Sequence, residues 1–271
     1  MGPDHAGWRT TTAITVKVRL TTVDQGLMSL TGDLERARAT RVAIEELIAE
    51  PSLLGPDFQP IRRLSDDTVV GQKATGRGRP GTEVGDTLSL LEGANRLGLA
   101  ERLDWAWRCH TFDVAVDAGM AVELHLTPEP ATYAVPCPPR LAVSFARGRR
   151  ALTVVAELHD DSFADLAKLR RAVEEMRGWG WGLAVDDLAD DEAVTSALPW
   201  LRPDYVQVDV SRPGRASSDR TRAWVETGRS VGARVMAIGV DGPRQRAEAV
   251  ALDADCARGL ALGAPSPSPQ S

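Results

Sequence analysis

The stretch that decides the fold reads TVVAELHDD at Thr153–Asp161, continues through a helical segment, and ends in GWGLAVDDLADD at Gly180–Asp191. Residues Leu152–Glu157 are mainly β-branched and apolar without alternation, which is typical of a strand buried on both faces. The segment Asp160–Arg177 repeats apolar residues at spacings of three and four, which predicts an amphipathic helix. A second buried strand is predicted at Gly182–Asp187.

These elements form a strand–helix–strand unit, so the two strands are expected to be parallel neighbours. Each strand ends in acidic residues, namely Glu157 in the first and Asp186 and Asp187 in the second. Because functional side chains of α/β folds collect at the carboxyl ends of parallel strands, we expect these three acids to lie at one site.

The rest of the chain repeats the same pattern after an initial hairpin. The hairpin is predicted at Phe58–Arg62 and Thr68–Ala74, with its turn at Ser65–Asp67. Further strands are predicted at Met120–Leu126, Asp204–Val210, Ala233–Val240 and Asp255–Leu260. Further helices are predicted around 34–47 and at Gly85–Leu97, Glu101–Val116, Ser218–Val231 and Arg244–Leu252. This order, without a glycine-rich dinucleotide fingerprint after any strand, predicts an α/β fold of the (β/α)8 barrel type.

The ends and one internal segment lack such patterning. We interpret residues 1–27 as a poorly ordered N-terminal extension, 28–265 as the barrel domain, and 266–271 as a disordered tail. The proline-rich stretch Pro128–Pro139 cannot be a continuous helix, and we expect it to be an irregular loop over the outer face of the barrel that forms a partner-specific surface. Replacement of Thr132–Pro138 is expected to leave stability nearly unchanged and to weaken partner binding. Trp105, Trp107 and Phe112 are expected in the core.

Composition excludes several classes of protein. The chain has 271 residues, 43% hydrophobic content and a net charge of −6, which argues against general nucleic-acid binding. No apolar run is long enough to span a bilayer. The three cysteines lack metal-type spacing, so we expect reduced thiols and a cytoplasmic protein.

Eight short motifs, in order and with compatible spacing, resemble those of the EAL domain family. They are FQPI (Phe58–Ile61), VVGQKATGR (Val69–Arg77), LHLTPE (Leu124–Glu129), VVAELHDD (Val154–Asp161), LAVDDLADD (Leu183–Asp191), RPDYVQVD (Arg202–Asp209), AIGVDG (Ala237–Gly242) and ARGLALGAP (Ala257–Pro265). The resemblance implies a modified (β/α)8 barrel of the EAL type. It also implies the family's activity, hydrolysis of cyclic di-GMP with two divalent cations held at the strand ends.

The chain departs from the family pattern at several catalytic positions. Five residues replace the family's glutamate, asparagine, lysine, second glutamate and glutamine, and these are Lys73, His125, Gln207, Ile238 and Arg258, respectively. The retained residues are Glu157, Asp186, Asp187, Asp209 and Arg77. A lysine ammonium in place of a carboxylate repels a cation about 4 Å away by about 4 kcal/mol per unit charge at an effective dielectric constant of about 20. We therefore expect no catalytic residues and no bound metal, with magnesium or manganese needed only for residual activity.

Lys73 has a structural interpretation. We expect its ammonium to lie within hydrogen-bonding reach of Glu157 or Asp186, where it replaces a mobile metal ion by an attached cation. An alternative for the retained acids is a new zinc or iron site built from His125, Glu157, His159 and Asp186.

The most favoured function is that of a catalytically inactive, regulatory EAL-like domain that binds an unidentified protein. One alternative is a receptor that binds cyclic di-GMP or another nucleotide without cleaving it, through Arg77, Glu157, Asp186 and Asp209. Another is a weak residual phosphodiesterase. A homodimer is left open, and neither nucleic acid nor membrane is an expected partner.

Overall fold

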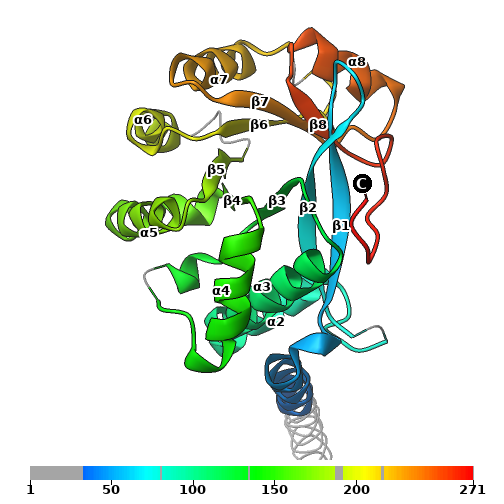
Figure 1. The fold of residues 1–271 in the computed structure, drawn as a ribbon, viewed down its shortest axis with the longest axis vertical. Coiled ribbons are helices and arrows are strands. Elements are labelled where there is room, and N and C mark those ends of the chain that lie inside the picture. Colours follow the sequence, from blue (N-terminus) through cyan, green and yellow to red (C-terminus); the bar gives the residue numbers. More distant parts are fainter. Residues whose placement is uncertain (1–32, 80, 134, 187–191, 215–216, 271) are drawn as a thin grey trace, which may run out of the picture.

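Eight strands close into a barrel in sequence order (Figure 1), as the sequence predicted. The structure is a computed structural model that describes residues 33–79, 81–133, 135–186, 192–214 and 217–270. The strands are β1 (Gly55–Arg63), β2 (Val69–Arg77), β3 (Glu123–Leu126), β4 (Val154–Leu158), β5 (Gly182–Val185), β6 (Tyr205–Asp209), β7 (Arg234–Ile238) and β8 (Cys256–Arg258).

The first strand runs against both of its neighbours. β1 and β2 form the predicted antiparallel hairpin, and β1 closes the barrel by pairing antiparallel with β8 through Arg62 and Arg63. All pairs from β2 to β8 are parallel. The carboxyl ends of β2 to β8 therefore meet at one mouth, which is where the sequence analysis placed the retained acids.

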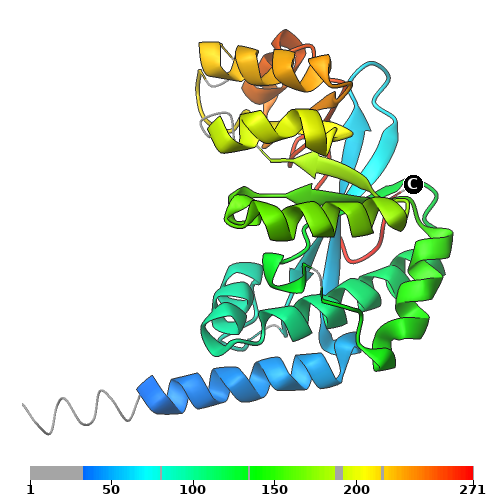
Figure 2. The same ribbon diagram turned by 90° about the vertical axis from the view of Figure 1, so that its left-hand side faces the viewer.

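Helices cover the outside of the barrel (Figure 2). They are α2 (Thr87–Leu97), α3 (Ala100–Asp117), α4 (Ala142–Ala151), α5 (Leu166–Gly178), α6 (Glu192–Leu201), α7 (Asp219–Ser230) and α8 (Pro243–Ala251). The helix predicted from Asp160 starts later, because Asp160–Phe163 forms a separate 3-10 turn and Asp165 caps α5 by accepting from the backbone of Lys168.

Two helices, α4 and α6, were not anticipated. Helix α4 carries four arginine or glycine positions that weaken its pattern, yet it packs closely on α3. A Cβ atom at Gly148 would lie 2.3 Å from the ring of Phe112, so this glycine permits the close approach of the two helices. The element depends on a tertiary contact that local periodicity does not encode.

The core has two parts. A large apolar layer lies between strands and helices and contains Trp105, Trp107 and Phe112, which confirms their predicted burial. A smaller cluster fills the barrel interior with Ile61, Val155, Ala184, Tyr205, Met236 and Cys256. Above this apolar plug, the inward-facing side chains toward the mouth are mostly polar.

The two ends of the chain differ from each other. The predicted extension 1–27 lies outside the described residues, and residues 33–49 form the predicted helix, which buries Ile44, Leu47 and Ile48 and extends past the barrel (Figure 2). The tail predicted to be disordered instead runs beside β1: Ser266 and Phe58 exchange two backbone hydrogen bonds, of 2.7 and 3.0 Å. The Gln72 amide adds a 2.5 Å bond to the carbonyl of Gln270.

The proline-rich segment is also more firmly attached than expected. It contains two short 3-10 turns, Pro130–Thr132 and Pro139–Leu141, so it is not a continuous helix, as predicted. Between them Tyr133 is buried, and its hydroxyl lies 3.0 Å from that of Ser162. These contacts lead us to expect that the segment contributes to stability, contrary to the expectation from its composition. Among the described residues, no helix is long and apolar enough to cross a membrane.

Candidate functional site

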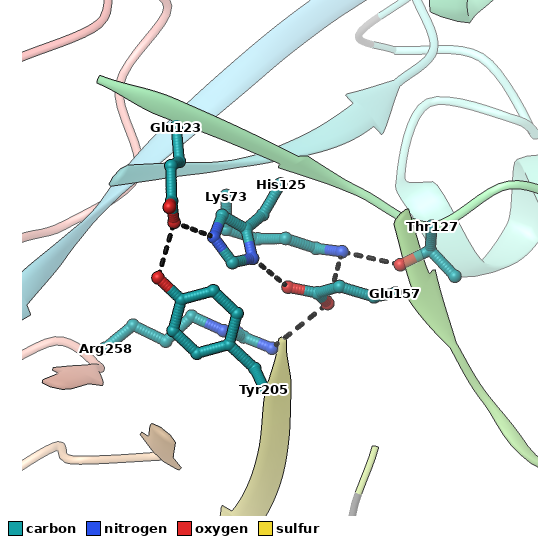
Figure 3. Close-up of polar contacts among 7 residues, drawn as sticks. All are labelled: Lys73, Glu123, His125, Thr127, Glu157, Tyr205 and Arg258. Atoms are coloured by element: carbon teal, nitrogen blue, oxygen red, sulfur yellow. Dashed lines mark hydrogen bonds and ion pairs between the residues drawn. The ribbon is translucent and has the colours of Figure 1, made fainter. Parts of the chain in front are cut away.

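Lys73 points into the barrel and contacts the neighbouring strand ends (Figure 3). The parallel register places Lys73 beside His125, and strand alternation turns both side chains inward. The ammonium of Lys73 donates a 2.7 Å hydrogen bond to Oε2 of Glu157 and a 2.5 Å bond to Oγ1 of Thr127. Its reach to Glu157 is the contact that the sequence analysis predicted.

His125 is fully buried between two carboxylates (Figure 3). Its Nδ1 lies 3.2 Å from Oε1 of Glu157, and its Nε2 lies 3.3 Å from Oε2 of Glu123. An ionised carboxylate only accepts hydrogen bonds, so a ring nitrogen that bonds to one of these ionised acids is the donor. The imidazole thus links an acid at the mouth to an acid deeper in the barrel.

Glu123 anchors the deep end of this network. It accepts hydrogen bonds from the Tyr205 hydroxyl at 2.5 Å and from the Arg234 guanidinium at 3.1 Å, and Arg234 lies 4.0 Å above the ring of Tyr205. Burial alone would raise the pKa of Glu123, but the hydrogen bonds that it accepts, from His125 first, outweigh burial and lower its pKa to about 2. Glu123 is therefore an ionised, structural acid at neutral pH.

Glu157 lies between the positively charged side chains of Lys73 and Arg258. Burial opposes its charged form, but the charge of Lys73 and the hydrogen bond from His125 outweigh burial and hold the pKa of Glu157 well below its usual range. The guanidinium of Arg258 adds a longer contact, 3.9 Å from Oε2. The predicted substitutions Lys73, His125 and Arg258 thus all converge on this one retained acid.

The remaining predicted residues lie elsewhere around the mouth. Arg77 forms an ion pair with Asp57 of β1, at 3.0 Å between Nε and Oδ2. Asp186 follows β5 and contributes to the electrostatic environment of Lys73, whereas Asp187 lies outside the described residues. Asp209 accepts a 2.8 Å hydrogen bond from the backbone N–H of Ser211, in the loop that follows β6.

Two substituted positions show no direct contact with Glu157. Gln207 is fully buried, and neither of its amide atoms has a hydrogen-bond partner among the described residues. Ile238 is partly buried and packs on the apolar plug. At these positions the family resemblance places a lysine and a glutamate, so the far side of the mouth has lost charge of both signs.

The histidine-containing metal site is not assembled as predicted. Glu157 and His125 do meet, but Glu157 is also paired with Lys73. Within the described ranges, His159 instead groups with Asp160 and Asp161, whose ligand atoms and its own all lie within 4.8 Å of one another.

Sequence reasoning missed Thr127 at the mouth and the deep half of the network, namely Glu123, Tyr205 and Arg234. A signal was present, because Glu123 and Thr127 each lie two positions from His125 and so share its face of the strand. Tyr205 stands in the same relation to Gln207. Their mutual contacts depend on the barrel register, which the sequence alone does not give.

Comparisons with known proteins agree with the barrel fold. The EAL domain family model matches residues 41–265, and no curated protein matches the sequence. The FimX EAL domain of Xanthomonas citri, in complex with c-diGMP, superposes with a TM-score of 0.73 at 12% identity and covers 88% of this chain and 97% of its own.

Two further solved structures are similar. The FimX EAL domain of Pseudomonas aeruginosa bound to c-di-GMP has a TM-score of 0.69 at 16% identity, covering 84% of this chain and 97% of its own. The PaMucR phosphodiesterase in its c-di-GMP complex has a TM-score of 0.66 at 20% identity, covering 82% and 95%. The structural likeness shows a shared fold, and the family model spans most of the barrel. The chain belongs to the EAL domain family.

Proposed function

We propose that this chain is a regulatory EAL domain that does not hydrolyse cyclic di-GMP and that acts by binding another protein. One observation carries the proposal: the ammonium of Lys73 lies 2.7 Å from Glu157, at the position where the family resemblance places a metal-binding glutamate. The ammonium of Lys73 thus occupies a place beside Glu157 where a metal ion would otherwise bind.

The residues present do not fit a pair of divalent cations. Hard divalent cations require several oxygen ligands in fixed geometry. Here Glu157 is surrounded by the ammonium of Lys73, the imidazole of His125 and the guanidinium of Arg258. Each positive charge about 4 Å from a metal ion repels it by about 4 kcal/mol per unit charge at an effective dielectric constant of about 20. Hydrolysis with two such ions therefore does not fit these residues.

The N-terminal helical residues 33–49 support a role in protein binding. They extend past the barrel (Figure 2), and their Leu34 and Val42 side chains are largely exposed. Exposed apolar side chains on a projecting element favour an interaction with another protein. The helix is anchored on the barrel by Ile44, Leu47 and Ile48, so a bound partner would lie against a fixed surface.

A receptor for cyclic di-GMP is the second candidate. It is favoured by the ligand named for the similar structures, cyclic di-GMP, and by Arg258 at the mouth, since guanidinium groups bind phosphates well. Against it, the other predicted phosphate ligand, Arg77, is already engaged with Asp57. Binding through Arg77 would require breaking this ion pair.

Two measurements on the purified chain test these functions. Calorimetric titration with cyclic di-GMP measures binding, and product formation with magnesium or manganese measures hydrolysis. We expect neither heat nor product. Saturable heat without product would support the receptor instead, and metal-dependent product that Asp186→Asn abolishes would overturn the proposal.

Capture of partners from lysate tests the interaction surface. Proteins retained by the native chain should be lost from a Leu34→Glu/Val42→Glu variant. A Leu260→Glu variant, which changes another exposed leucine next to β8, is the matched control and should retain them. Equal capture by both variants would remove the helix as the binding surface.

A further inference from the structure

A cavity of about 310 Å³ opens beside Lys73, between the carboxyl ends of β2 and β3 and the helices α2 and α3. Its walls are largely apolar, and they include Leu90, Leu91, Leu103 and the ring of Trp107. The charged or titratable side chains at its edge are Lys73, Asp104, Glu129 and His159. Small-molecule sites typically combine roughly 300–1,000 Å³ of apolar cavity with a few polar groups, which is the arrangement found here.

Most of these charged groups already have partners of opposite charge. Lys73 is neutralised by Glu157. The buried Asp104 forms an ion pair with Arg108 one helical turn along α3. His159 contacts Asp160 at 3.3 Å. These pairs leave little charge to attract a ligand.

Glu129 is the exception. Within the described ranges, no lysine or arginine forms a salt bridge with its carboxylate, although the side chain is partly buried at the edge of the cavity. Burial first, and then the nearby acid Asp104, raises the pKa of Glu129, whereas the nearby His159 acts in the opposite direction. A positive charge placed beside this carboxylate would offset both burial and repulsion, because it would give Glu129 the kind of ion pair that Asp104 has with Arg108.

Trp107 supplies an aromatic ring to the cavity wall. Its side chain is 8% exposed, and its indole N–H is buried against Gly76, where a Cβ atom would be 2.8 Å from Nε1. Aromatic faces attract cations and other rings. The ring therefore favours a ligand with a cationic group and a flat or apolar body.

We propose that this cavity binds a small organic cation, an ammonium or guanidinium group carried on an apolar or aromatic body. The cationic group donates charge-assisted hydrogen bonds to Glu129, and the body lies against Trp107 and Leu103. Phosphate-bearing ligands are disfavoured here, because the unpaired charge is negative. The site does not depend on whether the chain binds cyclic di-GMP or a protein.

Three probes of similar shape and different charge test the proposal: phenethylammonium, 2-phenylethanol and phenylacetate, each titrated by calorimetry into the full chain. We expect phenethylammonium to bind tightest and phenylacetate weakest. Glu129→Gln should weaken phenethylammonium by about tenfold or more, the effect of one lost charge-assisted hydrogen bond, and should leave 2-phenylethanol unchanged.

Two variants complete the design. Glu92→Gln removes the same charge from an exposed position of α2 next to Leu91, and it should leave all three affinities unchanged. Leu91→Trp should fill the cavity and abolish binding of both phenethylammonium and 2-phenylethanol, while thermal melting confirms that the variants are folded. Absence of saturable phenethylammonium binding at millimolar concentration, phenylacetate binding as tight as phenethylammonium, or an equal loss in Glu92→Gln and Glu129→Gln would overturn the proposal.

Discussion

The ammonium of Lys73 lies 2.7 Å from the carboxylate of Glu157, although the two residues are 84 positions apart in the sequence. Both side chains are 7% exposed. Such a buried pair need not stabilise the fold relative to apolar residues, but loss of one member leaves the other charge buried without compensation. Each of these two buried charges therefore needs the other as its partner, and removal of either one is expected to destabilise the fold.

Removal of the lysine alone should be costly. Lys73→Ala is expected to lower the free energy of unfolding by about 3–5 kcal/mol, the usual cost of breaking a buried ion pair. Lys73→Met/Glu157→Leu, which removes both charges and keeps apolar volume, should lie closer to the native value. Urea denaturation of the native chain and of the two variants measures these free energies, and Arg36→Ala, which breaks an exposed ion pair, is the control. A Lys73→Ala variant as stable as the native chain would contradict this interpretation.

Reversal of the charge at residue 73 tests for a latent metal site, in which two carboxylates at this position would share a metal ion. Lys73→Glu places a second carboxylate beside Glu157, so in chelator it should be less stable than Lys73→Ala because like charges repel. Addition of magnesium should restore part of the stability if the two carboxylates can share a cation. Melting with and without magnesium measures this, and the native chain is the control. An equal response of both proteins to magnesium would exclude the latent site.

The acid limb of the stability profile should depend on Glu123. Its pKa is about 2 in the folded protein against an ordinary value of 4.5, so its contribution is complete above about pH 4.5 and is lost as the pH falls toward 2. The difference corresponds to about 3 kcal/mol. Glu123→Gln should flatten the decline between pH 5 and pH 2, measured by urea denaturation. The same slope in Glu123→Gln as in an exposed control, Glu92→Gln, would refute this assignment.

The C-terminal segment should contribute to stability. A chain ending at residue 265 loses the two backbone hydrogen bonds between Ser266 and Phe58 and leaves the buried amide of Gln72 without the carbonyl of Gln270. At about 0.5–1.5 kcal/mol for each bond, the expected loss is roughly 2–4 kcal/mol. Gln270→Ala keeps the backbone carbonyl and serves as the control. Identical melting of the native and shortened chains would show that these contacts are dispensable.

The proline-rich segment should also be needed for stability. Tyr133→Ala removes a buried ring and should lower the free energy of unfolding by about 3–5 kcal/mol, as for other large-to-small core changes. Tyr133→Phe keeps the ring and loses only the contact with Ser162, so its cost should be about 1 kcal/mol. Thermal or urea denaturation distinguishes the two. A Tyr133→Ala variant with native stability would mean that the segment is as loosely attached as its composition suggests.

The central contact of the site could be predicted by combining local patterns with the family resemblance. Strand periodicity sets which residues face inward, and strand order sets which strand ends are neighbours. The resemblance to the EAL family placed Lys73 in the mouth, at the position of a metal-binding glutamate, with Glu157 at another strand end of the same mouth. Strand and helix patterns also predicted the eight strands and the burial of Trp105 and Phe112.

Other features depend on contacts that no local pattern encodes. The placement of Tyr205 against Glu123 requires the register across the barrel, and the position of the tail requires Ser266 to meet Phe58 on β1. His159 does not join His125 and Glu157 as the alternative metal site supposed, because it lies beyond the end of β4 and turns toward Asp160. Beyond the end of a strand, the direction of a side chain depends on the conformation of the loop, so strand alternation no longer predicts it.

The antiparallel closure of the barrel has a consequence for synthesis of the chain. β1 pairs with β2 soon after both strands emerge, but its other edge meets β8 much later, and Arg62 donates a hydrogen bond to the carbonyl of Leu262, 200 residues along the chain. Until β8 is synthesised, therefore, one edge of the hairpin has unpaired backbone groups, and such edges are prone to pair with other chains. Contacts of this sequence separation also form slowly. The growing polypeptide thus depends on β8 to cover a strand edge that forms long before it.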